Sequence, residues 1–162
     1  MPAWDAVTAA SPALAGRVRS ALDAHLHKVL ATLRADGSPR VSGTEVDFRL
    51  GEVWLGSMPG AVKVRDLQRD GRFAIHSAPA DETLATPDVK LAGIAVEVVD
   101  DARIETWRRS RAAEGREQPP GPFHLFRLDV RELVATSLGD PPDHLVIESW
   151  SPARGTRRLE RR

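Results

Sequence analysis

A serine and a lysine lie close together where a predicted strand is followed by a predicted helix. Ser57 ends the stretch "VWLGS", and Lys63 falls in the first turn of the short basic helix that begins near Gly60. A hydroxyl, the free backbone N–H groups of a helix start and an ammonium group all bind phosphate well. The sequence therefore predicts a phosphate-binding corner at Ser57 and Lys63.

The spacing at this corner excludes one kind of site and leaves another interpretation open. It does not match the P-loop pattern G-x-x-x-x-G-K-[ST], and a meander precedes it, so a nucleoside triphosphate site is not expected. The alternative is that Lys63, Arg65 and Arg69 form the solvated face of an amphipathic helix, because such faces are common. Lysine is nevertheless rare here, since most of the 23 basic residues are arginine.

The elements that must position this corner begin with a helix and a β-meander. A serine followed by proline starts a helix over about residues 12–26. Two β-rich runs follow, joined at Asp36-Gly37, a dipeptide typical of a hairpin turn. A third strand over Glu52–Ser57 leads to the basic helix over about residues 60–69.

The second half of the chain continues the strand pattern with one further helix. Strands are predicted in "RFAIHSA", "VKLAGIAVEVVDD", "FHLFRLDVRELVATSL" and "HLVIESW", with Gly93 at a bulge or a close approach. A helix is predicted at "ARIETWRRSRAAEG", whose Arg108, Arg109 and Arg111 are interpreted as a solvated face. Short antiparallel strands with few helices favour a closed or nearly closed β-barrel, which leaves few exposed edges.

Length and composition limit the class of protein. A chain of 162 residues with 41% hydrophobic residues suits one domain over residues 1–162, with an N-terminal helix within 1–27 and a basic tail over 151–162. Basic and acidic residues balance at 23 each, so no net charge favours nucleic acid or an anionic membrane. The sequence has no cysteine, no long apolar run and no cleavable leader, and we expect a soluble cytoplasmic protein.

The five histidines are scattered along the chain. None forms a metal-ligand spacing such as H-x-x-x-H or H-E-x-x-H, so no metal site is predicted. Each is interpreted as a structural or exposed residue. His76 is the one to test, because its strand follows the phosphate corner.

Four stretches resemble the pyridoxamine 5'-phosphate oxidase-like family of flavin-binding split barrels in their order and spacing. They are "KVLATLRADGSPRV", "VWLGS", "GAVKVRDLQRDGRFAI" and "GIAVEVVDD", and together they cover roughly residues 28–101. The resemblance implies a mainly β fold, a six-stranded antiparallel split barrel of the FMN-binding type with flanking helices. It also implies a homodimer that binds FMN or a deazaflavin coenzyme in clefts at the subunit interface.

The resemblance further implies which residues bind the cofactor. Arg40, Val41 and Ser42 match the strand that lines the flavin ring and its phosphate region in the family. Ser57 matches a hydroxyl that contacts the cofactor, and Lys63 matches the phosphate-binding lysine of the family's S-R-K stretch.

This sequence departs from the family pattern beside that lysine. Ala61 and Val62 stand where the family has serine and arginine, so half of the charged clamp is missing. Arg65 or Arg40 could supply the missing charge. Alternatively, the protein binds a different cofactor whose phosphate lies elsewhere.

The C-terminal stretch is also similar to the family, though more weakly. Trp150, followed by Arg158-Leu159 and Arg162, resembles the tryptophan and arginines that approach flavin and substrate from the second subunit. The alternatives are that Trp150 packs in the core or an interface and that the arginines are solvated.

The resemblance implies an oxidoreductase that transfers hydride to or from a small organic substrate. No catalytic residue is predicted, because in such chemistry the cofactor ring carries the hydride and the protein supplies position and electrostatics. The alternative is a non-catalytic dimeric barrel that holds flavin, haem or another tetrapyrrole, and a third hypothesis is a barrel without a ligand. Pyridoxamine-phosphate oxidase activity itself is disfavoured, since the chain has no tyrosine and that enzyme uses one for the substrate phosphate.

Overall fold

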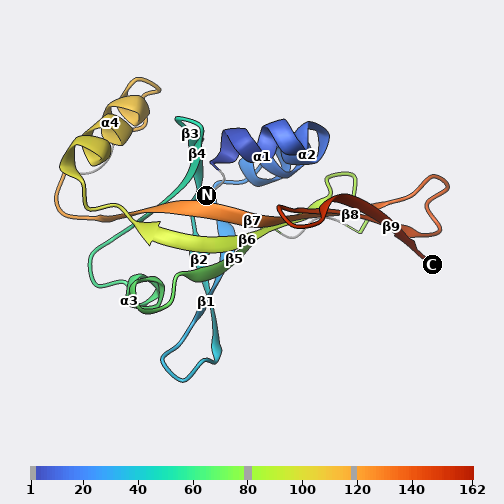
Figure 1. The fold of residues 1–162 in the computed structure, drawn as a ribbon, viewed down its shortest axis with the longest axis horizontal. Coiled ribbons are helices and arrows are strands. Elements are labelled where there is room, and N and C mark those ends of the chain that lie inside the picture. Colours follow the sequence, from blue (N-terminus) through green and yellow to red (C-terminus); the bar gives the residue numbers. More distant parts are fainter. Residues whose placement is uncertain (1–2, 79–81, 118–119) are drawn as a thin grey trace.

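A computed structural model describes residues 3–78, 82–117 and 120–162 of the chain. The described residues form one antiparallel sheet and four helices (Figure 1). The helices are α1 (Trp4–Ala10), α2 (Pro12–Asp23), α3 (Val62–Arg69) and α4 (Asp101–Ala112). The strands are β1 (Lys28–Leu33), β2 (Pro39–Thr44), β3 (Asp47–Arg49), β4 (Glu52–Ser57), β5 (Arg72–His76), β6 (Asp88–Glu97), β7 (His124–Leu138), β8 (Leu145–Ser151) and β9 (Gly155–Arg161).

The sheet is long, twisted and open at one place. Its strands follow the order β2-β1-β5-β6-β7-β4-β3, and β8 and β9 extend from the far end of β7 as a ribbon. In the described chain no pairing joins β2 to β3, although only two residues separate them. Figure 1 shows α1 and α2 on one side of β6 and β7, α3 on the other, and the β8–β9 ribbon reaching to the C-terminus.

The mainly β antiparallel prediction is confirmed, but the count of six strands is wrong because the described residues form a nine-stranded sheet. The run after Asp36-Gly37 divides at Glu45-Val46, since β2 pairs with β1 whereas β3 pairs with β4. The basic tail is the other source of the difference. It forms β9, which pairs with β8 along its whole length although each of its side chains is exposed.

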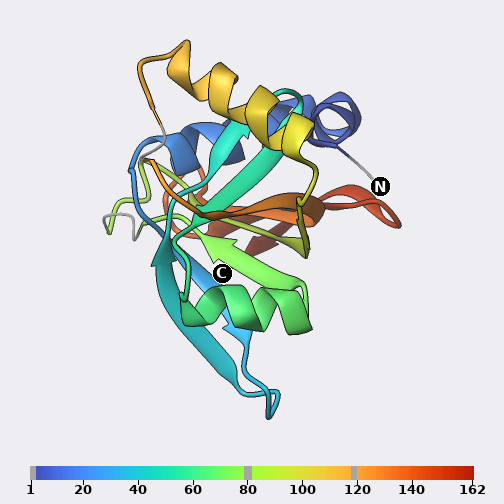
Figure 2. The ribbon, with the colours of Figure 1, turned by 90° about the vertical axis from the view of Figure 1, so that its left-hand side faces the viewer.

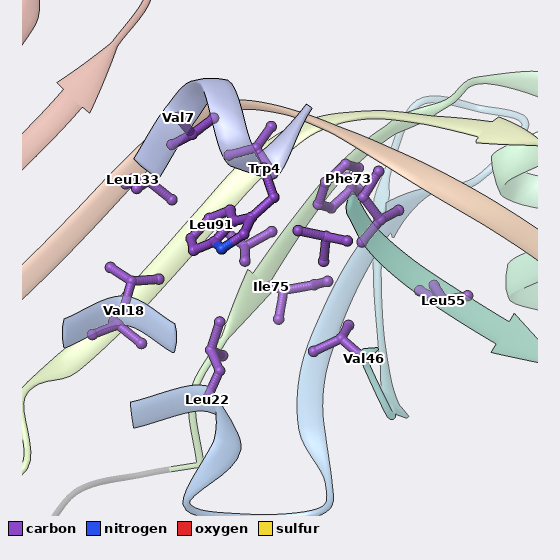
Figure 3. Close-up of a cluster of buried hydrophobic side chains, with 14 of the residues drawn as sticks. Trp4, Val7, Val18, Leu22, Val46, Leu55, Phe73, Ile75, Leu91 and Leu133 are labelled. Atoms are coloured by element: carbon purple, nitrogen blue, oxygen red, sulfur yellow. The ribbon is translucent and has the colours of Figure 1, made fainter. Parts of the chain in front are cut away.

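The core lies on the inner face of the sheet, beneath the N-terminal helices. Alternate strand residues such as Leu30, Ile75 and Leu91 are buried there, as expected for side chains that point to one face. Figure 3 shows Trp4 and Val7 of α1 among this cluster. The helix predicted over residues 12–26 is confirmed as α2, whereas α1 was not predicted.

The two longest strands approach each other closely at Gly93. The register of β6 and β7 shifts between Ala92 and Gly93, and a Cβ atom at Gly93 would lie 1.8 Å from the backbone oxygen of Asp129. The predicted bulge and close approach are confirmed, because no side chain fits there without a shift of the backbone. None of the helices in the described residues is both long and apolar enough to cross a membrane.

Candidate functional site

A cleft of about 600 Å³ is lined by residues from β2, β4, the first turn of α3 and α4. Figure 2 shows α3, in green, and α4, in yellow and orange, with strands between them. Ser57 and Lys63 both line the cleft, so the structure brings together the two residues of the predicted phosphate corner. This volume is in the range of small-molecule and cofactor sites.

Lys63 directs its amine at the cleft wall. Its Nζ donates a hydrogen bond of 2.7 Å to the backbone oxygen of Gly43, at the end of β2. Burial lowers the pKa of Lys63 below its ordinary value, and the nearby carboxylate of Glu45 offsets part of this effect. The amine is therefore a partly desolvated cation, and an anion that contacts it would restore the interactions that burial removes.

Ser57 presents a hydroxyl that has no partner within the described residues. Its Oγ is buried, and it makes no hydrogen bond there. A buried hydroxyl without a partner costs about 1–3 kcal/mol, so such groups commonly mark a place where a ligand binds. The start of α3 offers further hydrogen-bond donors, because Ala61 at its N-cap makes no side-chain capping bond to the first-turn N–H groups.

The other predicted residues on β2 do not line the cleft. Val41 is on the outer face of the sheet and is 69% exposed. Ser42 lies cross-strand from the buried Leu30, and its Oγ is a second buried hydroxyl without a partner in the described chain. Their predicted contacts with a cofactor stay predictions.

Arg40 is held away from the cleft by an ion pair. Its Nε donates at 2.6 Å to Asp66 on α3, and the same carboxylate accepts from Thr32 at 2.9 Å and from Arg69 at 3.0 Å. Burial raises the pKa of Asp66, but the hydrogen bonds from Arg40, Arg69 and Thr32 outweigh it and hold that pKa below 3.8. Asp66 therefore stays ionised and fixes the Arg40 side chain against α3.

Two residues of α4 form the opposite wall of the cleft. Trp107 is almost fully buried on β4, with its Cη2 about 4.0 Å from the Cβ position of Gly56. Arg111 lies one turn later, with its guanidinium carbon 5.0 Å from the centre of the Trp107 ring. Both line the cleft, as does Trp54 of β4.

Comparison with known proteins identifies the family. A family model described as Pyridoxamine 5'-phosphate oxidase matches residues 14–137. The chain belongs to this family. No protein of curated function matches the sequence.

Solved structures with the fold of this pyridoxamine 5'-phosphate oxidase family include three that cover most of the chain. A pyridoxamine 5'-phosphate oxidase-related, FMN binding protein from Nostoc punctiforme has a TM-score of 0.61 and 17% identity, and covers 95% of each chain. PhzG from Burkholderia lata, in complex with tetrahydrophenazine-1-carboxylic acid, has a TM-score of 0.61 and 14% identity, over 99% of this chain and 96% of that one. Campylobacter jejuni ChuZ has a TM-score of 0.67 and 13% identity, over 90% of this chain and 62% of that one.

Trp150 is the last of the predicted site residues, and it lies near the end of β8, where the β8–β9 ribbon joins the main sheet at Leu133. It is buried in the main core cluster, cross-strand from Leu133 on one side and from Thr156 on the other. It does not line the cleft of its own chain. Its contact with a cofactor stays a prediction.

Sequence reasoning missed the α4 wall. The interpretation of a solvated arginine face suits Arg109, which pairs with Glu105 at 3.4 Å, but it is wrong for Arg111. Arg111 is largely buried and forms an ion pair with Asp47. The spacing of Trp107 and Arg111 by four residues was the available signal, because such residues share one helix face.

Proposed function

We propose that this protein is a flavin- or deazaflavin-dependent oxidoreductase that transfers hydride to or from a small organic substrate. The observation that carries the proposal is the shared cleft of Lys63 and Ser57, a partly desolvated cation beside a buried hydroxyl without a partner in the described chain. Membership of the family supports a flavin-type cofactor. The cysteine-free sequence supports the predicted cytoplasmic location.

The residues present fit a phosphorylated ring cofactor. Lys63 would bind a phosphate oxygen in place of the Gly43 carbonyl, Ser57 would donate its hydroxyl proton, and N–H groups of the first turn of α3 would complete the anion site. A bound FMN or deazaflavin supplies hydride transfer. The protein then has to hold the phosphate, exclude water and orient the substrate, and no acid or base residue is required.

A homodimer is the proposed assembly, with a second copy covering the outer face of the sheet. Cross-strand pairs place Val41, Ala31, Ala74 and Ala92 in one row across β2, β1, β5 and β6. This row faces away from the core, since the neighbouring Leu30 is buried. A row made mostly of small apolar side chains suits close packing against an identical sheet, and membership of the family supports a dimer with the cofactor at its interface.

A specific observation also favours the alternative of a non-catalytic binding protein. The clamp positions hold Ala61 and Val62, and the nearby Arg40 is paired with Asp66 instead of facing the cleft. Lys63 is thus the one cation of the predicted clamp that lines the cleft in the described structure. A ligand without a phosphate, such as haem or another tetrapyrrole, would not need the missing charges.

Parallel titrations distinguish these functions. The purified protein is titrated with FMN, with the deazaflavin coenzyme and with haem, and binding is followed by quenching of ligand or tryptophan fluorescence. The proposal expects saturation by FMN or the deazaflavin and reduction of the bound cofactor by a hydride donor. Binding of haem alone would favour the non-catalytic alternative, and no binding of any of the three would contradict both.

A further inference from the structure

The α4 wall contains a guanidinium whose position is fixed and whose donors are not all used. Nε of Arg111 donates to the backbone oxygen of Arg116 at 3.2 Å, and its Nη1 contacts Asp47. Its Nη2 makes no hydrogen bond with any described residue. The side chain is 14% exposed, so it is held in place at the edge of the cleft.

The indole of Trp107 adds a second donor without a partner. The residue is 1% exposed, and its Nε1 is buried and makes no hydrogen bond within the described residues. The ring itself is fixed, because Phe123 stacks on it at 5.5 Å and Arg111 lies over it. In contrast, the indole N–H of Trp54, which also lines the cleft, already donates to the backbone oxygen of Arg49 at 2.9 Å.

Behind this wall, Asp47 lies in a cluster of arginines. Asp47 is surrounded by Arg49, Arg111 and Arg116, at 3.8 Å for Arg49 and 3.2 Å for Arg116. The cluster has one further carboxylate, the exposed Glu114, which pairs with Arg49. Three cations thus face two anions in this cluster, of which Arg111 and Asp47 line the cleft, and Lys63 and Glu45 are the other charged residues of its lining. Two N–H donors without a partner in the described chain, one of them on a guanidinium, match the two oxygens of a carboxylate.

We propose that Arg111 and Trp107 bind a carboxylate of the substrate, so that the substrates of this protein are small organic acids. The inference rests on the proposed function, in which Lys63 and Ser57 hold the cofactor phosphate at the other wall of the same cleft. The acid group is bound at α4, and the rest of the substrate extends toward the cofactor. Arg111 and Trp107 are then residues that determine specificity, and they take no part in hydride transfer.

Benzoate and the uncharged benzamide are suitable probes. Each is titrated into the cofactor-loaded protein and into the protein without cofactor, and calorimetry measures its binding. We expect benzoate to bind at least about tenfold more tightly than benzamide, because charge-assisted hydrogen bonds are about twice as strong as neutral ones. Arg111→Gln and Trp107→Phe should each weaken benzoate binding by about tenfold or more, with benzamide and FMN binding unchanged.

Two further variants keep the experiment decisive. Arg109→Gln on the same helix is the matched control, because its side chain is exposed and pairs with Glu105 outside the cleft. Arg111→Lys keeps a cation beside Asp47 and should retain folding but only part of the benzoate affinity. Arg111→Gln also leaves Asp47 paired with Arg116.

Equal affinity for the two probes, or benzoate binding that all variants share, would overturn the inference. A loss of FMN affinity that parallels the loss of benzoate affinity would also overturn it, because α4 would then serve the cofactor. Failure of the proposed function is distinguishable. In that case FMN does not bind, whereas the protein without cofactor still prefers benzoate and loses this preference in Arg111→Gln and Trp107→Phe.

Discussion

Replacing Asp66 by asparagine, which has the same shape but no charge, should lower the free energy of unfolding strongly. Asp66 is 2% exposed and accepts hydrogen bonds from Thr32 at 2.9 Å, Arg40 at 2.6 Å and Arg69 at 3.0 Å. In Asp66→Asn the remaining side-chain oxygen can keep the bonds from Arg40 and Thr32, whereas the NH2 group cannot accept from Arg69. The lost bond and the lost negative charge opposite Arg40 each cost about 1–1.5 kcal/mol. The two guanidinium groups are 27% and 40% exposed and keep access to water, so the full cost of a buried unpaired charge does not apply.

The expected loss is therefore about 2–3 kcal/mol at pH 7, which lowers the Tm of a chain of this length by about 4–12 °C. Urea denaturation followed by tryptophan fluorescence measures the free energy of unfolding. The difference between Asp66→Asn and the parent must also depend on pH. Because folding lowers the pKa of Asp66, its stabilisation is complete above the ordinary value of 3.8 and is lost as the pH falls through the lower folded value.

Asp70→Asn is the matched control for this experiment. Asp70 ends the same helix, but its carboxylate is at the surface, where hydrogen bonds from Arg72 lower its pKa to about 2. An exposed pair of this kind should leave the denaturation midpoint unchanged. A free energy of unfolding for Asp66→Asn within about 0.5 kcal/mol of the parent would refute the view that this carboxylate fixes Arg40 and α3 to the sheet.

Three further predictions concern the sheet, the dimer and the phosphate corner. Gly93→Ala should lower the free energy of unfolding by about 2–4 kcal/mol, because the new Cβ meets the backbone of Asp129 at 1.8 Å. Val41→Asp should convert the proposed dimer into a monomer in analytical ultracentrifugation, since it places a charge on the apolar row of β2. FMN affinity should fall as the pH rises through the pKa of Lys63, which burial places below 10.5, and Lys63→Arg should remove this dependence in fluorescence titrations.

Each of these has an outcome that would contradict it. Gly16→Ala is the control for the sheet prediction, because nothing lies within 4 Å of its new Cβ and a helical alanine is favourable. Equal losses in the two glycine variants would show that Gly93 is not closely packed. A dimer that persists in Val41→Asp would place the interface elsewhere. An FMN affinity that is constant to pH 10.5 would mean that the Lys63 amine does not hold the phosphate.

Local patterns in the sequence were sufficient for most elements of the fold. Asp36-Gly37 predicted the β1–β2 hairpin, and Gly37 has a φ of 82°, which explains the preference for glycine there. The β-rich runs predicted the long strands, and Gly93 predicted the bulge or close approach between them. These features depend on neighbours in the chain, and a short window of sequence contains them.

What depends on distant contacts was not predictable in this way. The β9 strand has only exposed side chains, so its pairing with β8 leaves no hydrophobic pattern in the sequence. The pairing of Arg40 with Asp66 joins residues 26 positions apart, and Arg111 reaches Asp47 across 64 positions. The corner of Ser57 and Lys63 was predictable because both residues lie on one strand-to-helix connection, whereas the α4 wall needed the fold.

The measurement that tests the phosphate corner most directly is the dissociation constant of FMN for Lys63→Met and for Arg109→Met. Arg109 is an exposed cation on α4 outside the cleft, so its variant controls for loss of charge alone. If Lys63 holds the phosphate, Lys63→Met should weaken FMN binding by about tenfold to a hundredfold, and Arg109→Met should leave it unchanged. Equal FMN affinity in the parent and in both variants would contradict the phosphate assignment.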